Sequence, residues 1–170
     1  MVILFSGRKS KTEKEIIEIL ETYGANYISD KSVSENSGNF TIISTYKKTD
    51  IKLEKGIAVF IDDTDRFKKQ TFPIGIIGIC EDTNTVALEK FKKSGIAVIS
   101  CGMNLKNTIT LSSINDNGLF AVLQRTVTDN SGKTIDPCEF KIKLNKEYSP
   151  FAIMASVAVL LINGIFPKEF

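Results

Sequence analysis

The chain has 170 residues, of which 42% are hydrophobic and 25% are charged, and its formal net charge is +2. These values are typical of globular proteins, so they favour one domain with a buried core and exclude wholesale disorder. The charge is too small to indicate binding to nucleic acid or to an anionic membrane. The absence of histidine excludes Ser-His-Asp and Cys-His catalysis and histidine-ligated zinc.

The sequence shows no targeting or membrane signal. Only residues 2–5 are apolar before a polar stretch begins, which does not fit a signal peptide. The most apolar helix candidate, residues 151–165, is shorter than the roughly 20 residues that a membrane span needs. Cys80, Cys101 and Cys138 lack CxxC spacing, so neither a disulfide framework nor a zinc site is indicated. We therefore expect a soluble, cytoplasmic domain with inert thiols.

The first part of the chain is predicted to contain several strands and one helix. A short apolar run over residues 2–5 indicates a buried strand, and apolar residues at helical spacing indicate a helix over residues 11–23. Gly24 is suited to end this helix. The pairs that can form a capping box at its start are Ser10 with Glu13, or Thr12 with Glu15. The further strands are predicted over residues 27–28, 40–46, 50–53 and 57–61.

The middle of the chain reads as a compact strand-helix-strand unit. Its strands are predicted over residues 74–79 and 96–99, and its helix over residues 85–93, ending at Gly95. Such a unit places its two strands parallel in one sheet with a right-handed crossover.

The last third has a different texture. Residues 107–113 alternate between apolar and polar side chains, and so do residues 118–128 and 135–144, which flank a turn at residues 129–132. This pattern predicts an antiparallel hairpin. A final helix follows, with Ser149 predicted as its cap and Gly164 at its end, and so few polar residues that it should be buried.

The predicted elements define one α/β domain over residues 1–170. We expect a three-layer, Rossmann-like fold with a mostly parallel sheet, a C-terminal antiparallel β-hairpin region and a buried final helix.

The best candidate for an anion site is the first strand-to-helix turn. Ser6, Gly7, Arg8, Lys9 and Ser10 combine backbone amides, a glycine and two cations with the N-terminus of a helix. A phosphate or a carboxylate uses such groups. The alternative is an ordinary turn of an α/β protein, because many such turns share this composition.

Acidic residues follow two of the predicted parallel strands. Asp62, Asp63 and Asp65 come after residues 57–61, while Glu81 and Asp82 come after the next strand. Paired carboxylates at strand ends can hold Mg²⁺, and ligands of α/β proteins usually bind at this edge. Asp62, Asp63, Glu81 and Asp82 are therefore metal candidates, and the alternative is that they cap local turns.

Gly132-Lys133-Thr134 imitates the end of a phosphate-binding loop. That motif also requires a glycine five positions before its final glycine, and Val127 stands there. The flanking segments read as the two strands of a hairpin, in which Ser-Gly is ordinary turn chemistry. We therefore interpret this sequence as a hairpin turn.

The second half of the chain resembles part of the central domain of the Mur ligases, ATP-dependent enzymes that add amino acids to peptidoglycan precursors. The resemblance covers residues 75–167 and rests on the strand, acidic turn, helix and strand of residues 76–102, the alternating strands, and the last helix, which ends in Asn163-Gly164-Ile165. Glu81-Asp82 stands at the family's acidic turn. The family's Gly-Lys-Thr nucleotide loop is missing from the first turn, and its His-Asn before the last helix is replaced by residues 147–149. No catalytic residue is therefore carried over from the family.

Two hypotheses about function follow. The preferred one is a Mur-ligase-like domain without ligase chemistry and without a cofactor, which acts as a binding or interaction module for a small molecule or a protein. The alternative is an enzyme or sensor that binds a phosphate- or nucleotide-type anion with the help of Mg²⁺. A homodimer built on the exposed edge of the hairpin region is a further expectation.

Overall fold

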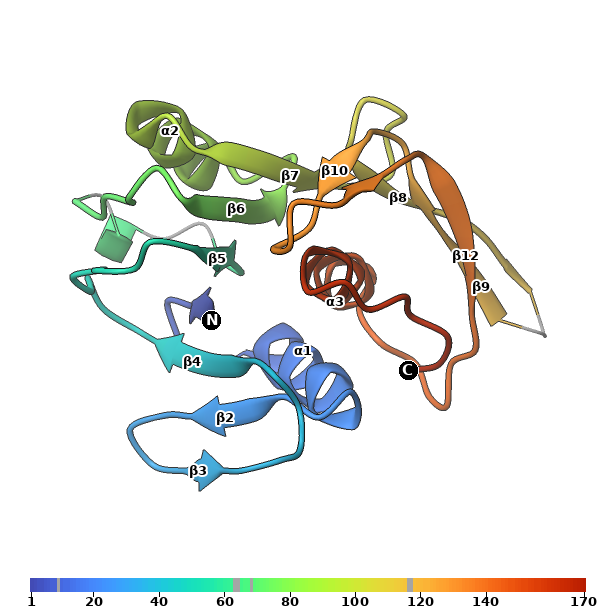
Figure 1. Ribbon diagram of the computed structural model, residues 1–170, viewed down its shortest axis with the longest axis horizontal. Helices are drawn as coiled ribbons and strands as arrows, with labels where there is room; N and C mark the ends of the chain where they lie inside the picture. The colour runs from blue at the N-terminus through green and yellow to red at the C-terminus, as the bar shows by residue number, and fades with distance from the viewer. Residues whose placement is uncertain (9, 63–64, 68, 116–117) are drawn as a thin grey trace.

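The chain folds around a ten-stranded sheet, as seen in a computed structural model that describes residues 1–8, 10–62, 65–67, 69–115 and 118–170 (Figure 1). The strands are β1 (Val2–Phe5), β2 (Asn26–Ile28), β3 (Val33–Ser34), β4 (Thr41–Thr45), β5 (Gly56–Phe60), β6 (Ile76–Glu81), β7 (Ala97–Cys101), β8 (Ile109–Asn115), β9 (Gly118–Leu123), β10 (Val127–Thr128), β11 (Thr134–Ile135) and β12 (Cys138–Ile142). The helices are α1 (Lys11–Thr22), η1 (Asp65–Phe67, a 3-10 helix), α2 (Thr85–Ser94) and α3 (Pro150–Ile162).

The sheet is parallel in its centre and antiparallel at both ends. Its order is β12-β9-β8-β7-β6-β5-β1-β4-β2-β3, and neighbouring strands are parallel from β2 through to β8. Strands β3, β9 and β12 join antiparallel, and β10 and β11 form a separate two-stranded sheet. The prediction of a mostly parallel sheet with a C-terminal antiparallel region is confirmed.

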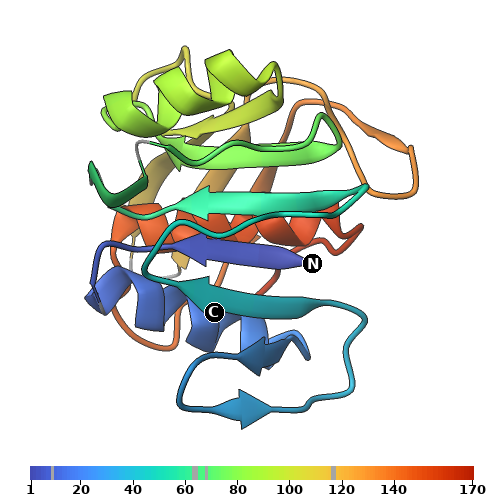
Figure 2. The same ribbon diagram turned by 90° about the vertical axis from the view of Figure 1, so that its left-hand side faces the viewer.

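The helices lie on both faces of the sheet, which makes three layers. Helix α2 covers one face, while α1 and α3 cover the other (Figures 1 and 2). Strands β8, β9 and β12 curve around α3 (Figure 1). Each face therefore has its own apolar core, as the Rossmann-like prediction requires.

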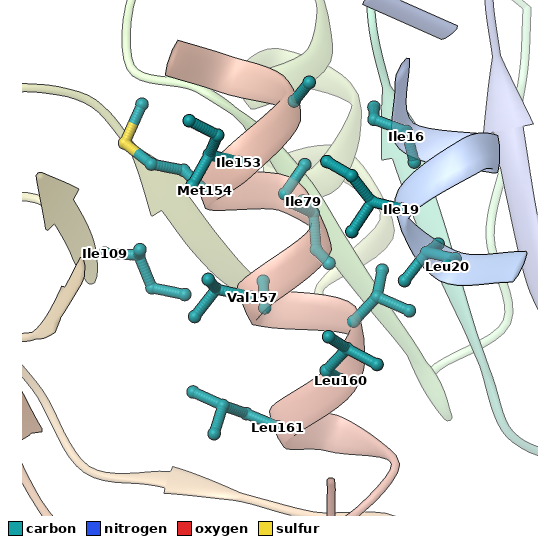
Figure 3. Close-up of a cluster of buried hydrophobic side chains, with 14 of the residues drawn as sticks. Ile16, Ile19, Leu20, Ile79, Ile109, Ile153, Met154, Val157, Leu160 and Leu161 are labelled. Atoms are coloured by element: carbon teal, nitrogen blue, oxygen red, sulfur yellow. The ribbon is translucent and has the colours of Figure 1, made fainter. Parts of the chain in front are cut away.

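Helix α3 fills the larger core. Every residue from Phe151 to Ile162 is buried, and the helix packs against α1 and β8 with side chains such as Ile19 and Ile109 (Figure 3). Because almost no polar side chain interrupts this helix, no orientation would leave a solvated face. The buried final helix is confirmed. No helix in the described part of the chain is long and apolar enough to cross a membrane.

The smaller core is built from aromatic rings. Phe5 and Phe60 stack with their centroids 4.8 Å apart, and Phe67 and Phe91 meet the Phe60 ring edge-on at 5.5 Å and 5.4 Å. A Cβ on Gly78 would lie 2.7 Å from the Phe91 ring, so this strand position requires glycine for the helix to approach. Because Phe67 belongs to η1, this core also fixes η1 beside the end of β5.

One predicted strand and the predicted hairpin differ from the observed structure. The strand predicted over residues 50–53 is absent, and the Gln70 side chain bonds the amide and carbonyl of the preceding residue, Thr49, at 2.9 Å and 2.8 Å. The predicted hairpin is divided into β9–β12 and β10–β11. The division follows Gln124, whose amide donates to the Thr108 carbonyl at 2.8 Å as the chain leaves the large sheet.

Ser149 is the N-cap residue of α3, as predicted, but it does not make the side-chain bond of a cap. The Ser149 hydroxyl and amide instead donate to the Glu15 carboxylate of α1, at 2.5 Å and 3.0 Å. A carboxylate from another helix thus supplies the acceptor that an N-terminus needs.

Candidate functional site

The first strand-to-helix turn joins β1 to α1. Ser10 caps α1, and its hydroxyl accepts a 3.1 Å bond from the Glu13 amide. Of the two predicted caps, Ser10 and Thr12, the structure confirms Ser10. Ser10, Lys11 and Thr12 stand at the helix start, where a phosphate-binding loop has Gly-Lys-Ser/Thr. Lys11 pairs with Glu15 of the next turn at 3.4 Å. The order of residues imitates a nucleotide loop, but serine replaces the glycine and the lysine pairs with a carboxylate of its own helix.

The turn also contacts an acidic residue of the segment that follows β5. Asp62 accepts hydrogen bonds from the Ser6 hydroxyl at 2.9 Å and from the Gly7 amide at 3.0 Å. The Ser6 hydroxyl also lies close to the Arg8 carbonyl oxygen. The structure therefore brings together the predicted basic turn and the first acidic turn. The Asp62 carboxylate occupies the position that the Gly7 amide would offer to an outside anion.

A cavity of about 320 Å³ lies beside this turn. It collects residues that follow β1, β2, β4 and β5, so it lies at the carboxyl edge of the parallel strands. Across the sheet, β1 lies between β4 and β5, so the strand order reverses beside β1. Ligands of α/β sheets bind at such a switch point. The lining residues used below are Gly7, Arg8, Asp30, Lys31, Tyr46 and Arg66.

The charge of the cavity is mainly positive. Arg8, Lys31 and Arg66 contribute three cations, against the single carboxylate of Asp30 among the lining residues. Arg66 donates to the Gly7 carbonyl and so ties η1 to the turn. Within the described residues, the side chains of Arg8 and Lys31 have no hydrogen bond or ion pair. Their charge is therefore available to a ligand.

Tyr46, which follows β4, also lines the cavity. Its hydroxyl donates to the Glu13 carboxylate at 2.8 Å. Burial, and then the bond to Glu13, raise the pKa of Tyr46, so the phenol stays neutral. The ring offers an apolar face among charged neighbours, a combination suited to a ligand with a carbon skeleton and an anionic group.

The second acidic turn lies at the end of β6. Glu81 is the last residue of this strand, and burial followed by repulsion from Asp82 raises its pKa. Asp82 accepts a 2.7 Å bond from the Asn107 side-chain amide. A Cβ on Gly102 would lie 2.7 Å from the Asp82 carboxylate, so a glycine is needed there. This turn is thus organised with the loop after β7.

The predicted metal site divides between these two turns. Asp62 bonds Ser6 and Gly7, whereas Asp82 bonds Asn107. Among the residues that the structure describes, no three Cys, Asp or Glu side chains lie close enough to hold a metal ion. Asp63 and Lys9, which belong to the predicted metal and anion sites, lie outside the described residues. Binding of Mg²⁺ by these acids stays a prediction.

The cysteines and the loop mimic occupy structural positions. Cys80 and Cys101 are buried, and burial raises the pKa of the Cys80 thiol to about 12 and that of Cys101 well above its ordinary value. Such thiols are inert. Gly132-Lys133-Thr134 turns from β10 to β11, with Gly132 at a φ of 89°. The hairpin interpretation of this sequence is confirmed.

No protein-family model matches the sequence, and no curated protein matches it. Solved structures do. The ligase for UDP-N-acetylmuramate:L-alanyl-gamma-D-glutamyl-meso-diaminopimelate (MPL) from Neisseria meningitides matches with a TM-score of 0.60 at 13% identity, over 99% of this chain and 62% of that chain. A murein peptide ligase from Psychrobacter arcticus matches with a TM-score of 0.56 at 10% identity, over 98% of this chain and 44% of that chain.

A third match is E. coli FolC in complex with DHPP and ADP, with a TM-score of 0.53 at 12% identity, over 97% of this chain and 53% of that chain. The chain thus spans less than two thirds of the length of each of these enzymes. The match extends over nearly the whole chain, beyond the residues 75–167 that suggested the resemblance. The chain therefore shares the α/β fold of the Mur ligase central domain.

Proposed function

We propose that this domain binds a small anionic molecule at the carboxyl edge of its sheet and does not carry out ATP-dependent ligation. The contact of the Asp62 carboxylate with the Gly7 amide, at 3.0 Å and beside a cationic cavity, carries the proposal. In nucleotide enzymes a single loop supplies both the backbone amides and the cation that bind phosphate, whereas in this domain the two are separate. The phosphate position of the turn is filled from within, while the neighbouring cavity keeps cations for a ligand.

Three features of the turn disfavour a nucleotide. A phosphate oxygen at the Gly7 amide would meet the Asp62 carboxylate, and two anions at this distance repel. Ser10 places a side chain where a phosphate-binding loop has glycine, and that side chain is used as the helix cap. Lys11 pairs with Glu15 at 3.4 Å, so a phosphate would compete with this carboxylate for the lysine.

The cavity fits a small ligand. At about 320 Å³ it lies at the lower end of the roughly 300–1,000 Å³ that ligand pockets occupy. Arg8 and Arg66 have the planar donor geometry that suits carboxylate and phosphate groups. Two of the matched structures are ligases of UDP-N-acetylmuramate or murein peptides. Fragments of peptidoglycan precursors that carry carboxylates or phosphates are therefore the first compounds to test.

A thermal-shift titration tests the proposal, with inorganic phosphate, pyrophosphate and muramyl dipeptide as probes. A ligand at about 100 times its dissociation constant stabilises the folded protein by about 2.7 kcal/mol, which corresponds to a rise in Tm of roughly 5–10 °C for a domain of this size. We expect at least one probe to give such a rise, and Arg8→Ala to abolish it. Lys93→Ala is the matched control, because this lysine lies on α2, outside the residues that line the cavity.

Two results would decide against the proposal. No shift with any probe, or a shift that survives in Arg8→Ala and Lys31→Ala alike, would show that this cavity is not the anion site. The Mg²⁺-assisted alternative makes a different prediction. It requires Mg²⁺ to strengthen the shift and Asp82→Asn to remove that effect.

A further inference from the structure

A second cavity, of about 330 Å³, lies between β7 and the segment that contains β10. Ala97, Val98 and Ile99 line one side of it, and residues 125–128 line the other. Figure 1 shows β10 next to β7, above α3. This cavity involves none of the residues that line the anion site.

The β7 side presents unpaired main-chain groups. The Ser100 carbonyl accepts from the Thr108 amide at 2.9 Å, so Ser100 directs its backbone away from β6. Val98 precedes Ser100 by two residues and directs its own amide and carbonyl to the same side. Strand β8 pairs with β7 only at Cys101, and within the described residues Val98 has no backbone partner on this side. The edge of β7 is therefore open at Val98.

The opposite side is open in the same way. Strand β10 pairs with β11, and the Asp129 amide donates to the Lys133 carbonyl at 2.9 Å. Hydrogen-bonded pairs alternate along an antiparallel ladder, so Val127 directs its backbone toward β11. Thr126 and Thr128 then direct theirs toward the cavity, and neither has a backbone partner in the described part of the chain.

Two open edges that line one cavity suit a ligand with donors and acceptors along both of its sides. An extended peptide has this arrangement, because successive residues direct their amides and carbonyls to opposite sides. The β7 wall is three residues long, or about 10 Å at the usual strand rise, which matches three residues of peptide. Ile77, Ile99 and Val127 supply apolar contacts for an aliphatic side chain.

The charge at the cavity selects among peptides. Arg125 is exposed and uses one guanidinium nitrogen to donate to the Lys106 carbonyl at 2.7 Å. The cavity lining includes no acidic residue, so the other donors of Arg125 have no carboxylate partner there. An acidic side chain next to the aliphatic residues would meet this charge.

We propose that an extended, aliphatic and acidic segment of a partner protein binds between β7 and β10 and adds a strand there. This interaction surface is independent of the anion site and goes beyond the proposed function. Strand addition of this kind draws affinity from main-chain hydrogen bonds and specificity from the side-chain pockets.

The test uses ¹⁵N-labelled protein and a pool of acetylated, amidated tetrapeptides with valine, isoleucine or threonine at the first three positions and aspartate at the last. We expect saturable shifts of the Val98, Thr126 and Thr128 amide signals. A pool N-methylated at its second and third residues should bind at least about tenfold more weakly, since it lacks main-chain donors. No shift at millimolar peptide, shifts elsewhere only, or equal binding of the methylated pool would overturn the proposal.

A charge reversal provides a second readout without disturbing the core. Arg125→Glu should bind the aspartate pool about threefold more weakly and a pool ending in lysine more tightly than the wild type does. Lys133→Glu is the matched control, because this lysine lies in the β10–β11 turn and does not line the cavity. Equal effects of the two variants would refute the assignment of Arg125. Light scattering that shows self-association through this edge would instead make a second copy the occupant and overturn the proposal.

Discussion

Glu15 of α1 connects this helix to the N-terminus of α3, on the side of the sheet that holds the larger core. Its removal should destabilise the domain measurably. The carboxylate is 5% exposed and accepts the Ser149 amide at 3.0 Å and the Ser149 hydroxyl at 2.5 Å. Two bonds to a charged acceptor at a helix N-terminus contribute about 1 kcal/mol each once solvent access at the half-buried Ser149 is considered. Glu15→Ala should therefore lower the free energy of unfolding by about 2 kcal/mol.

Urea denaturation followed by circular dichroism measures this change, with an accompanying fall in Tm of roughly 4–8 °C. Glu18→Ala is the matched control from the same helix. Glu18 pairs with Lys146 at 2.6 Å, but both side chains are about half exposed, so its loss should cost less than about 1 kcal/mol. If Glu15→Ala cost no more than Glu18→Ala, the inference that Glu15 caps α3 would be wrong.

Other outcomes follow from the same contacts. Burial raises the pKa of Glu15, but the bonds from Ser149 and then Lys11 lower it by more, to below its ordinary 4.5. The associated stability should therefore be complete above pH 4.5 and be lost as the pH falls through the lower folded value, and Glu15→Gln should flatten this loss in urea titrations. Labelling of the folded protein with a thiol reagent at neutral pH should leave Cys80 unmodified, and rapid labelling would contradict its burial. Gly78→Ala should lower the free energy of unfolding by about 1–3 kcal/mol in the same urea assay, because the new Cβ meets the Phe91 ring of α2. An unchanged urea midpoint would contradict that packing.

The sequence predicted the elements whose signals are local. The continuous apolar run of β5 predicted a central strand, and the nearly all-apolar composition of α3 predicted a buried helix. An element that is buried on every side is apolar throughout, so its own residues are enough to predict it. Gly24 and Gly95 end their helices with φ of 84° and 66°, which is the conformation that predicted them.

Contacts between distant segments could not be predicted in this way. Asp62 reaches Gly7 across 55 residues of sequence, and Glu15 reaches Ser149 across 134. A carboxylate that accepts from the backbone amide of a distant segment leaves no pattern in its own segment. The sequence therefore suggested a metal for Asp62 and a cap bond within its own helix for Ser149. By contrast, the likeness of Ser10-Lys11-Thr12 to a nucleotide loop and the four-residue spacing of Lys11 and Glu15 are local patterns that the sequence itself carries.

The central proposal is that this domain, which has a Mur-ligase-like fold, binds a small anion and does not ligate. Release of inorganic phosphate from Mg²⁺-bound ATP, measured with and without muramyl dipeptide, tests this claim most directly. We predict no release above that of buffer, because the Asp62 carboxylate fills the phosphate position at the Gly7 amide. Protein-dependent release that is abolished by Lys9→Ala or Lys11→Ala would contradict the account and restore a nucleotide to the first turn.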